Sequence, residues 1–90
     1  MTHKAYLSIT DAVRAVLRDV LDEFLAEPFG QVDPVASSEQ ALLLLQALPL
    51  DSAEFGLAIN RLANARHYLE SGEYGAARFE LRLLRQSLEQ

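Results

Sequence analysis

The sequence predicts an all-α protein: a small four-helix bundle-like domain with a C-terminal antiparallel helical hairpin. Half of the 90 residues are hydrophobic and only 8% are aromatic, a composition that favours helices over sheet. The length suits one domain, residues 1–90. Apolar residues recur at helical spacing in four segments. These predicted helices cover about residues 9–27, 38–48, 52–71 and 73–89.

The first predicted helix begins at Ser8. The hydroxyl of this residue can cap the free amides, and Asp11, three residues later, completes a capping box. The helix should end just before Pro28. Its apolar residues gather on one side, which predicts a core face. That face comprises Ile9, Val13, Val16, Leu17, Val20 and Phe24, with Leu21 and Leu25 beside it.

The connection at residues 28–37 contains two prolines and a glycine. Ser37 or Ser38 is predicted to begin the second helix, and an earlier turn capped by Asp33 is the alternative. Pro49 restricts the residue before it and so ends this helix. Leucines point in nearly every direction around the helix, which predicts that it is covered on most sides. They are Leu42, Leu43, Leu44, Leu45 and Leu48.

Asp51 and Glu54 form a second predicted capping box, and Gly72 can take the left-handed conformation that ends a helix. The fourth helix starts near Glu73, so helices three and four should form a tight hairpin. The fourth helix has two apolar stripes, which need two neighbours. One comprises Tyr74, Ala77, Leu81, Leu84 and Leu88, and the other comprises Ala76, Phe79 and Leu83.

Within this hairpin, Tyr68, Gly72, Tyr74 and Ala77 have the spacing of a tetratricopeptide repeat, so residues 61–84 resemble one such repeat. The resemblance implies that the tyrosines fill the wedge beside the turn and that a groove binds a peptide. The alternative is that any tight helical hairpin converges on this composition. A single repeat cannot bury its own faces, so its neighbours must come from the rest of the chain or from a partner.

Two surfaces of the fourth helix are candidate partner-binding sites. The side with Phe79 and Leu83 is predicted to be an oligomer or partner interface. Between the apolar stripes lie three arginines, Arg78, Arg82 and Arg85. They form either a solvated face opposite acidic residues of the first helix or a surface for an acidic partner. Those acidic residues are Asp19, Asp22 and Glu23.

Arg66 falls on the apolar side of the third helix, near Ile59 and Leu62. A buried arginine needs an acidic partner, and Glu70 or Glu73 is within reach. Arg66 at the edge of the stripe, with its guanidinium in water, is the alternative.

The charge and the cysteine content exclude several functions. The net charge is −5, with 13 acidic against 8 basic residues, which disfavours binding to nucleic acid or to an anionic membrane. With no cysteine, the chain has no disulfide and no thiolate nucleophile. The leucine run at residues 42–45 is far shorter than a membrane span. These observations predict a soluble, cytoplasmic protein.

No catalytic, cofactor or metal site is predicted, because the two histidines, His3 and His67, have no set of ligands around them. The enzyme alternative depends on Arg61 and His67. Their separation fits the Arg-x4-6-His spacing of HEPN ribonucleases, small helical proteins that work as dimers, and the chain resembles them in this spacing alone.

The sequence therefore predicts a non-enzymatic protein–protein interaction module, of a small acidic inhibitor, immunity or adaptor type. Asp19, Asp22 and Glu23 would face a basic partner. A homo-oligomeric assembly protein, such as a homodimer, and a HEPN-like ribonuclease are the alternatives.

Overall fold

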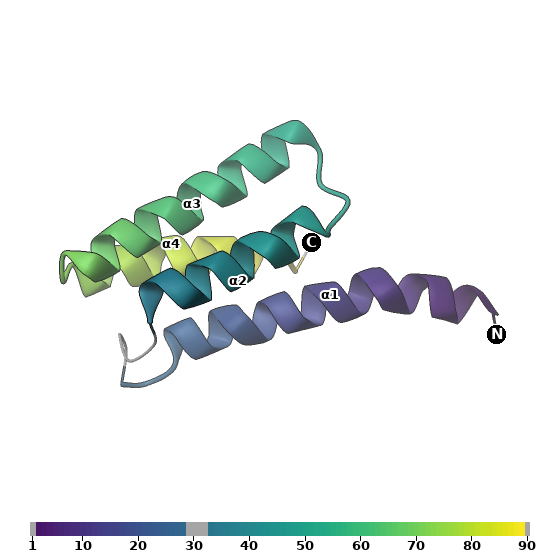
Figure 1. The fold of residues 1–90 in the computed structure, drawn as a ribbon, viewed down its shortest axis with the longest axis horizontal. Helices are drawn as coiled ribbons and strands as arrows, with labels where there is room; N and C mark the ends of the chain where they lie inside the picture. Colours follow the sequence, from purple (N-terminus) through teal and green to yellow (C-terminus); the bar gives the residue numbers. More distant parts are fainter. Residues whose placement is uncertain (1, 29–32, 90) are drawn as a thin grey trace.

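The computed structural model describes residues 2–28 and 33–89, with side chains from residue 9 onward, and this part of the chain folds into a bundle of four helices (Figure 1). They are α1 (Thr2–Leu25), α2 (Pro34–Gln46), α3 (Ser52–Glu70) and α4 (Tyr74–Ser87). Helices α1 and α3 each pack against both α2 and α4, and the α3–α4 hairpin has the most extensive contact. The predicted all-α class, bundle and hairpin are confirmed.

The core lies along the axis of the bundle, where all four helices contribute aliphatic side chains and α1 adds Phe24. Six large side chains are almost completely removed from water; they are Leu17, Leu21, Phe24, Leu45, Leu81 and Leu84. At about 25 cal/mol per Å² of apolar surface removed from water, such burial is the main stabilising contribution in a domain of this size.

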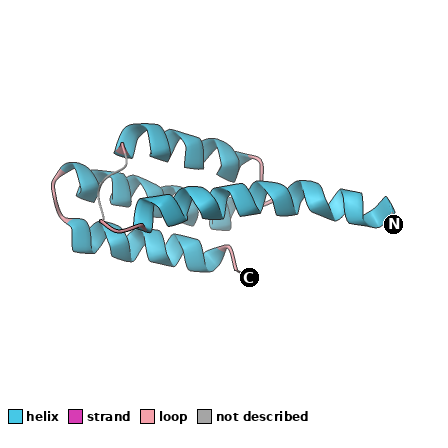
Figure 2. Cartoon of the chain, turned by 90° about the horizontal axis from the view of Figure 1, so that it is seen from below, coloured by secondary structure: helices cyan, strands magenta, loops and turns pink. Residues whose placement is uncertain are grey.

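Helix α1 is longer than predicted. It begins at Thr2, so the residues before Ser8 are helical and leave no free amide for Ser8 to cap. The prediction that Ser8 and Asp11 form a capping box is therefore wrong. With 24 residues α1 is about 36 Å long, and its N-terminal part projects beyond the other helices (Figures 1 and 2).

The projection of α1 also changes its core face. Ile9 is 70% exposed because it lies on the projecting part of α1, and Val16 is exposed although Val13 and Leu17 on either side of it pack in the core. The prediction that Ile9 and Val16 lie in the core is wrong. Val13 is partly buried against the core, complete burial starts with Leu17, and Leu21, predicted beside the face, is also completely buried.

Helix α2 starts at the earlier of the two predicted positions. Asp33 is its N-cap: the side chain Oδ1 accepts hydrogen bonds from the backbone N–H of Val35 at 3.0 Å and of Ala36 at 3.4 Å. The start at Ser37 or Ser38 is wrong, and Ser38 instead lies buried inside the helix. Leu43 is 68% exposed, so the prediction that the second helix is covered on most sides is wrong for this leucine.

The second capping box is confirmed at the start of α3. The Glu54 N–H donates to Asp51 Oδ1 at 2.7 Å, and the Asp51 N–H donates to Glu54 Oε1 at 3.1 Å. At the other end of α3, Gly72 has a φ of 79°, so the prediction that it takes the left-handed conformation is confirmed. The Glu73 N–H then donates to the Tyr68 carbonyl at 2.8 Å, which closes the turn into α4.

The first apolar stripe of α4 forms the contact with the core, where Ala77, Leu81, Leu84 and Leu88 are buried. Tyr74 was predicted to belong to this stripe but is exposed, because it stands at the very start of the helix. Tyr68 is half-buried against the core. Only one of the two tyrosines therefore fills the bend.

In the described part of the chain, no helix is both long enough and apolar enough to span a bilayer.

Candidate functional site

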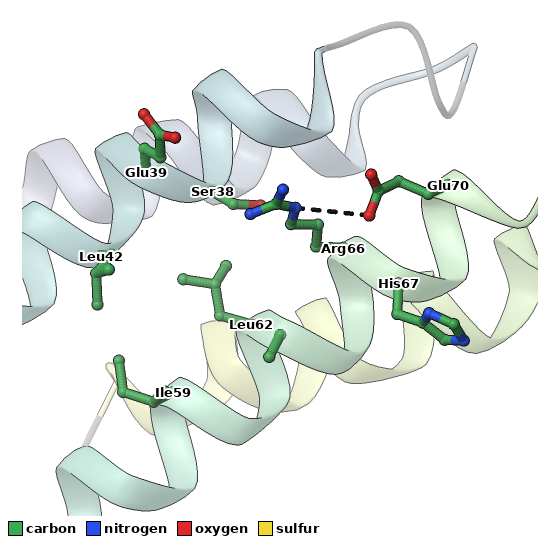
Figure 3. A pocket seen from close by; sticks show the side chains of 9 residues that line it. Ser38, Glu39, Leu42, Ile59, Leu62, Arg66, His67 and Glu70 are labelled. Carbon is green, nitrogen blue, oxygen red and sulfur yellow. Dashed lines mark ion pairs between the residues drawn. The ribbon is translucent and has the colours of Figure 1, made fainter.

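An open groove runs between α2 and α3 on the outside of the bundle (Figure 3). Its volume is about 340 Å³. We call it the α2–α3 groove and define it by its lining: Ser38, Glu39 and Leu42 of α2, and Ile59, Leu62, Ala63, Arg66, His67 and Glu70 of α3. The exposed lining is mostly apolar, which is typical of surfaces that bind other molecules.

Helical periodicity brings these side chains together. The α3 residues of the groove follow one another at alternating steps of three and one along the helix, so they share the side of α3 that faces α2. Ser38 and Leu42 are separated by one turn of α2 and face them. The groove therefore has one apolar end, with Leu42, Ile59 and Leu62, and one polar end toward Glu70 (Figure 3).

At the polar end, Arg66 forms an ion pair with Glu70 one turn later; the Nε–Oε1 distance is 3.5 Å (Figure 3). The predicted partner Glu70 is confirmed. Both side chains are partly exposed, with exposed fractions of 41% and 51%. The guanidinium thus lies at the edge of the apolar side, partly in water and beside Ser38, and a surface pair of this kind contributes only about 0.2 to 1 kcal/mol (Figure 3).

Ser38 is the buried polar residue of the groove. Only 6% of it is exposed, and its hydroxyl has no hydrogen-bond partner in the structure. Figure 3 shows this hydroxyl on the side of α2 that faces Arg66. An unsatisfied buried hydroxyl costs about 1 to 3 kcal/mol, so the site retains a hydrogen-bonding group that the fold itself does not use.

Two of the three predicted arginines of α4, Arg78 and Arg85, contact acidic residues at the C-terminal end of α1 and just after it. Arg85 Nε donates to Asp22 Oδ1 at 2.9 Å, and Arg85 Nη1 pairs with Glu89. Hydrogen bonds to Asp22 and then Glu89 raise the pKa of Arg85 above its ordinary value. Arg78 Nη2 contacts Glu27 Oε1 at 3.1 Å, a partner that the sequence did not indicate.

The other members of the charged set are exposed: Arg82 on α4, and Asp19 and Glu23 on α1. Part of the charged set thus forms ion pairs between the α1 and α4 regions, and the rest lies at the surface.

Phe79 and Leu83 lie on the side of α4 away from the buried stripe. Phe79 is 61% exposed and Leu83 is half-buried. No helix of the described chain covers this phenylalanine. It remains a candidate contact for another molecule.

Arg61 and His67 line different pockets. Arg61 Nη1 lies 3.9 Å from Glu80 Oε1 and contributes to a second hollow of about 370 Å³, which also contains Arg14 and Leu50. His67 lines the α2–α3 groove and stacks obliquely on Tyr68, with ring centroids 6.0 Å apart. Within a single chain, Arg61 and His67 therefore do not line a common site.

Among residues 9–28 and 33–89, no three His, Cys, Asp or Glu side chains gather closely enough to hold a metal ion. Comparison with known proteins found no matching family model, no similar curated protein and no similar solved structure. The tetratricopeptide resemblance of residues 61–84 therefore stays a prediction, although the hairpin itself is present.

Two features of the sequence bear on the groove. Arg66 falls on an apolar helix side, and α2 has more leucines than one core contact requires. Neither signal identified Ser38 or Glu39, because their place in the groove depends on how α2 is rotated against α3.

Proposed function

We propose that this chain is a non-enzymatic protein–protein interaction module that binds a segment of another protein in the α2–α3 groove. The observation that carries the proposal is the groove itself: an apolar recess with a polar end, outside the core, between two rigid helices. Binding surfaces of this type bury a few aliphatic anchors and surround them with polar contacts. The net charge of −5 fits a small acidic inhibitor, immunity or adaptor protein.

A pair of adjacent leucines offers a matched test. Leu42 lines the groove, whereas Leu43 is exposed and lies outside it. Leu42→Glu should abolish the binding of a cellular partner, because it places a charge among the apolar anchors. Leu43→Glu makes the same chemical change and should leave binding intact.

The measurement is affinity capture from a lysate of the source organism with immobilised wild type and both variants, after circular dichroism has confirmed that all three are folded. A partner retained by wild type and by Leu43→Glu, but lost with Leu42→Glu, supports the proposal. Identical captured proteins for all three chains, or none specific to the wild type, contradict it.

The enzymatic alternative can be tested on the same preparations. A HEPN-type ribonuclease requires Arg61 and His67 to act together, and they lie in separate pockets of one chain. Purified protein is expected not to cleave RNA. A robust cleavage activity that is lost in His67→Ala would refute the interaction proposal.

Self-assembly is the second candidate function, and the exposure of Phe79 favours it. A homodimer through α4 would cover Phe79 and Leu83, and Arg82 would lie near its edge. Mass measurement in solution, repeated with Phe79→Asp and Leu83→Asp, tests this candidate. A wild-type dimer that both changes convert to a monomer supports assembly, whereas a wild-type monomer excludes it.

A further inference from the structure

We infer that the second hollow of the bundle binds a small aliphatic carboxylate, whose charged group contacts Arg14 and Arg61 and whose chain lies against the core. This hollow, which we call the end pocket, has a volume of about 370 Å³. It lies at the end of the bundle where the α2–α3 connection and the last turn of α4 come together (Figure 1). It shares no lining residue with the α2–α3 groove, so it is separate from the proposed protein-binding site.

The inner wall of the end pocket is part of the hydrophobic core. Leu45, Ala58 and Leu88 line it and are at most 7% exposed. Leu50, which is half-buried, and Leu57, which is 51% exposed, continue the apolar lining toward solvent. Among the described residues that line the pocket, none is aromatic, so it has no stacking surface for a nucleobase. The lining suits an aliphatic chain, which leaves water when it enters.

Arg14 brings unused hydrogen-bond donors to this pocket. Its side chain is half-buried, and Nη1 donates to the Leu88 carbonyl at 3.3 Å. No carboxylate of the described chain lies within ion-pair distance of this guanidinium. Because a guanidinium has five N–H donors, most of those of Arg14 have no acceptor in the described part of the protein. A half-buried cation of this kind is stabilised by an anion that reaches it.

Arg61 adds a second guanidinium, from α3. Its side chain is 24% exposed, and Nη1 lies 3.9 Å from Glu80 Oε1, which is too far for a hydrogen bond. Its donors are therefore also available to a ligand. Because arginine presents its donors as a planar fork, it matches the two oxygens of a carboxylate.

The charge of the lining favours a single negative charge on the ligand. Glu54 is the carboxylate among the described lining residues, and its Oε1 accepts a hydrogen bond from the Asp51 N–H at 3.1 Å. Two arginines and one glutamate leave one net positive charge in the lining. A monocarboxylate matches this charge, whereas a dianion such as a phosphate monoester exceeds it and is repelled by a chain of net charge −5.

The test is isothermal titration calorimetry of the full chain with sodium octanoate, octan-1-ol and octylammonium chloride. We expect octanoate to bind, and the neutral and cationic compounds to bind at least about tenfold more weakly, because they lack the charge that the guanidiniums recognise. From butanoate to hexanoate to octanoate, affinity should rise by up to about fourfold for each CH₂ that is buried. These comparisons use the wild type alone, so they do not depend on the folding of a variant.

Variants then test the two arginines, after circular dichroism has confirmed that each variant is folded. Arg14→Gln and Arg61→Gln should each weaken octanoate binding about tenfold. The matched control is Arg18→Gln, which removes the same charge one turn further along α1, outside the lining of the end pocket. It should have little effect on octanoate binding.

Amide chemical shifts locate the bound octanoate, and we expect changes at Ala58 and Leu88. Changes confined to Leu42 and Ala63 would place the ligand in the α2–α3 groove and overturn the end pocket as its site. Equal binding of octan-1-ol and octanoate, or equal losses in Arg14→Gln and Arg18→Gln, would overturn recognition by the guanidiniums. No detectable binding of octanoate at millimolar concentration would overturn the whole inference, whereas the proposed protein partner is decided separately by Leu42→Glu.

Discussion

Ser38→Ala should make this protein more stable, although it removes a polar side chain from the middle of a helix. The hydroxyl is buried and unpartnered, and removing such a group recovers about 1 to 3 kcal/mol of desolvation cost. Alanine also has the higher helix propensity, which adds about 0.5 kcal/mol. The gap left by one oxygen subtracts about 0.5 kcal/mol.

The net gain in the free energy of unfolding is about 1 to 3 kcal/mol, and each kcal/mol raises Tm by about 4 to 8 °C for a domain of this size. Urea denaturation followed by circular dichroism at 222 nm measures it, with the slope m checked for constancy. The control is Ser37→Ala, the neighbouring half-buried serine of α2, which should gain only the propensity contribution.

Two results would contradict a destabilising, unpartnered hydroxyl at Ser38. If Ser38→Ala lowers the free energy of unfolding, the hydroxyl makes a stabilising hydrogen bond. If Ser37→Ala gains as much as Ser38→Ala, burial is not the cause of the effect.

Five further substitutions, in three tests, probe the fold by the same denaturation assay. Gly72→Ala should destabilise by about 1 to 2 kcal/mol, because φ is 79° there, whereas Gly56→Ala, inside α3 with open space around it, should stabilise by about 0.5 to 1 kcal/mol. Equal signs would contradict the left-handed turn. Leu81→Ala should cost about 2 to 5 kcal/mol and the exposed Leu43→Ala under about 0.5, and similar costs would place Leu81 outside the core. Asp51→Ala should cost about 1 kcal/mol, and no loss would argue against the capping box.

Local interactions were predictable where a few neighbouring residues decide the conformation. The capping box of Asp51 and Glu54 and the turn at Gly72 each involve groups within a few residues of one another, so both can be predicted from the sequence. The same local reasoning failed at Ser8, because a capping signal is overridden when the preceding residues also form a helix.

The candidate site was only partly predictable. The pairing of Arg66 with Glu70 is a one-turn contact within a helix and followed from the sequence. The contact of Arg78 with Glu27 joins residues that are 51 positions apart in the chain, and no local pattern in the sequence distinguishes Glu27 from the other exposed acidic residues.

Helix propensity, capping and periodicity act over a few residues, so the all-α class, the hairpin of α3 and α4, and the apolar stripe of α4 follow from the sequence. Which apolar residues are covered depends instead on how the helices pack. Ile9 and Leu43 match their buried neighbours in chemistry but have no helix above them, whereas Leu42 and Ile59 meet across a groove. The rotation and offset of packed helices depend on the whole core, so they, rather than any local pattern, place Ser38 beside Arg66 (Figure 3).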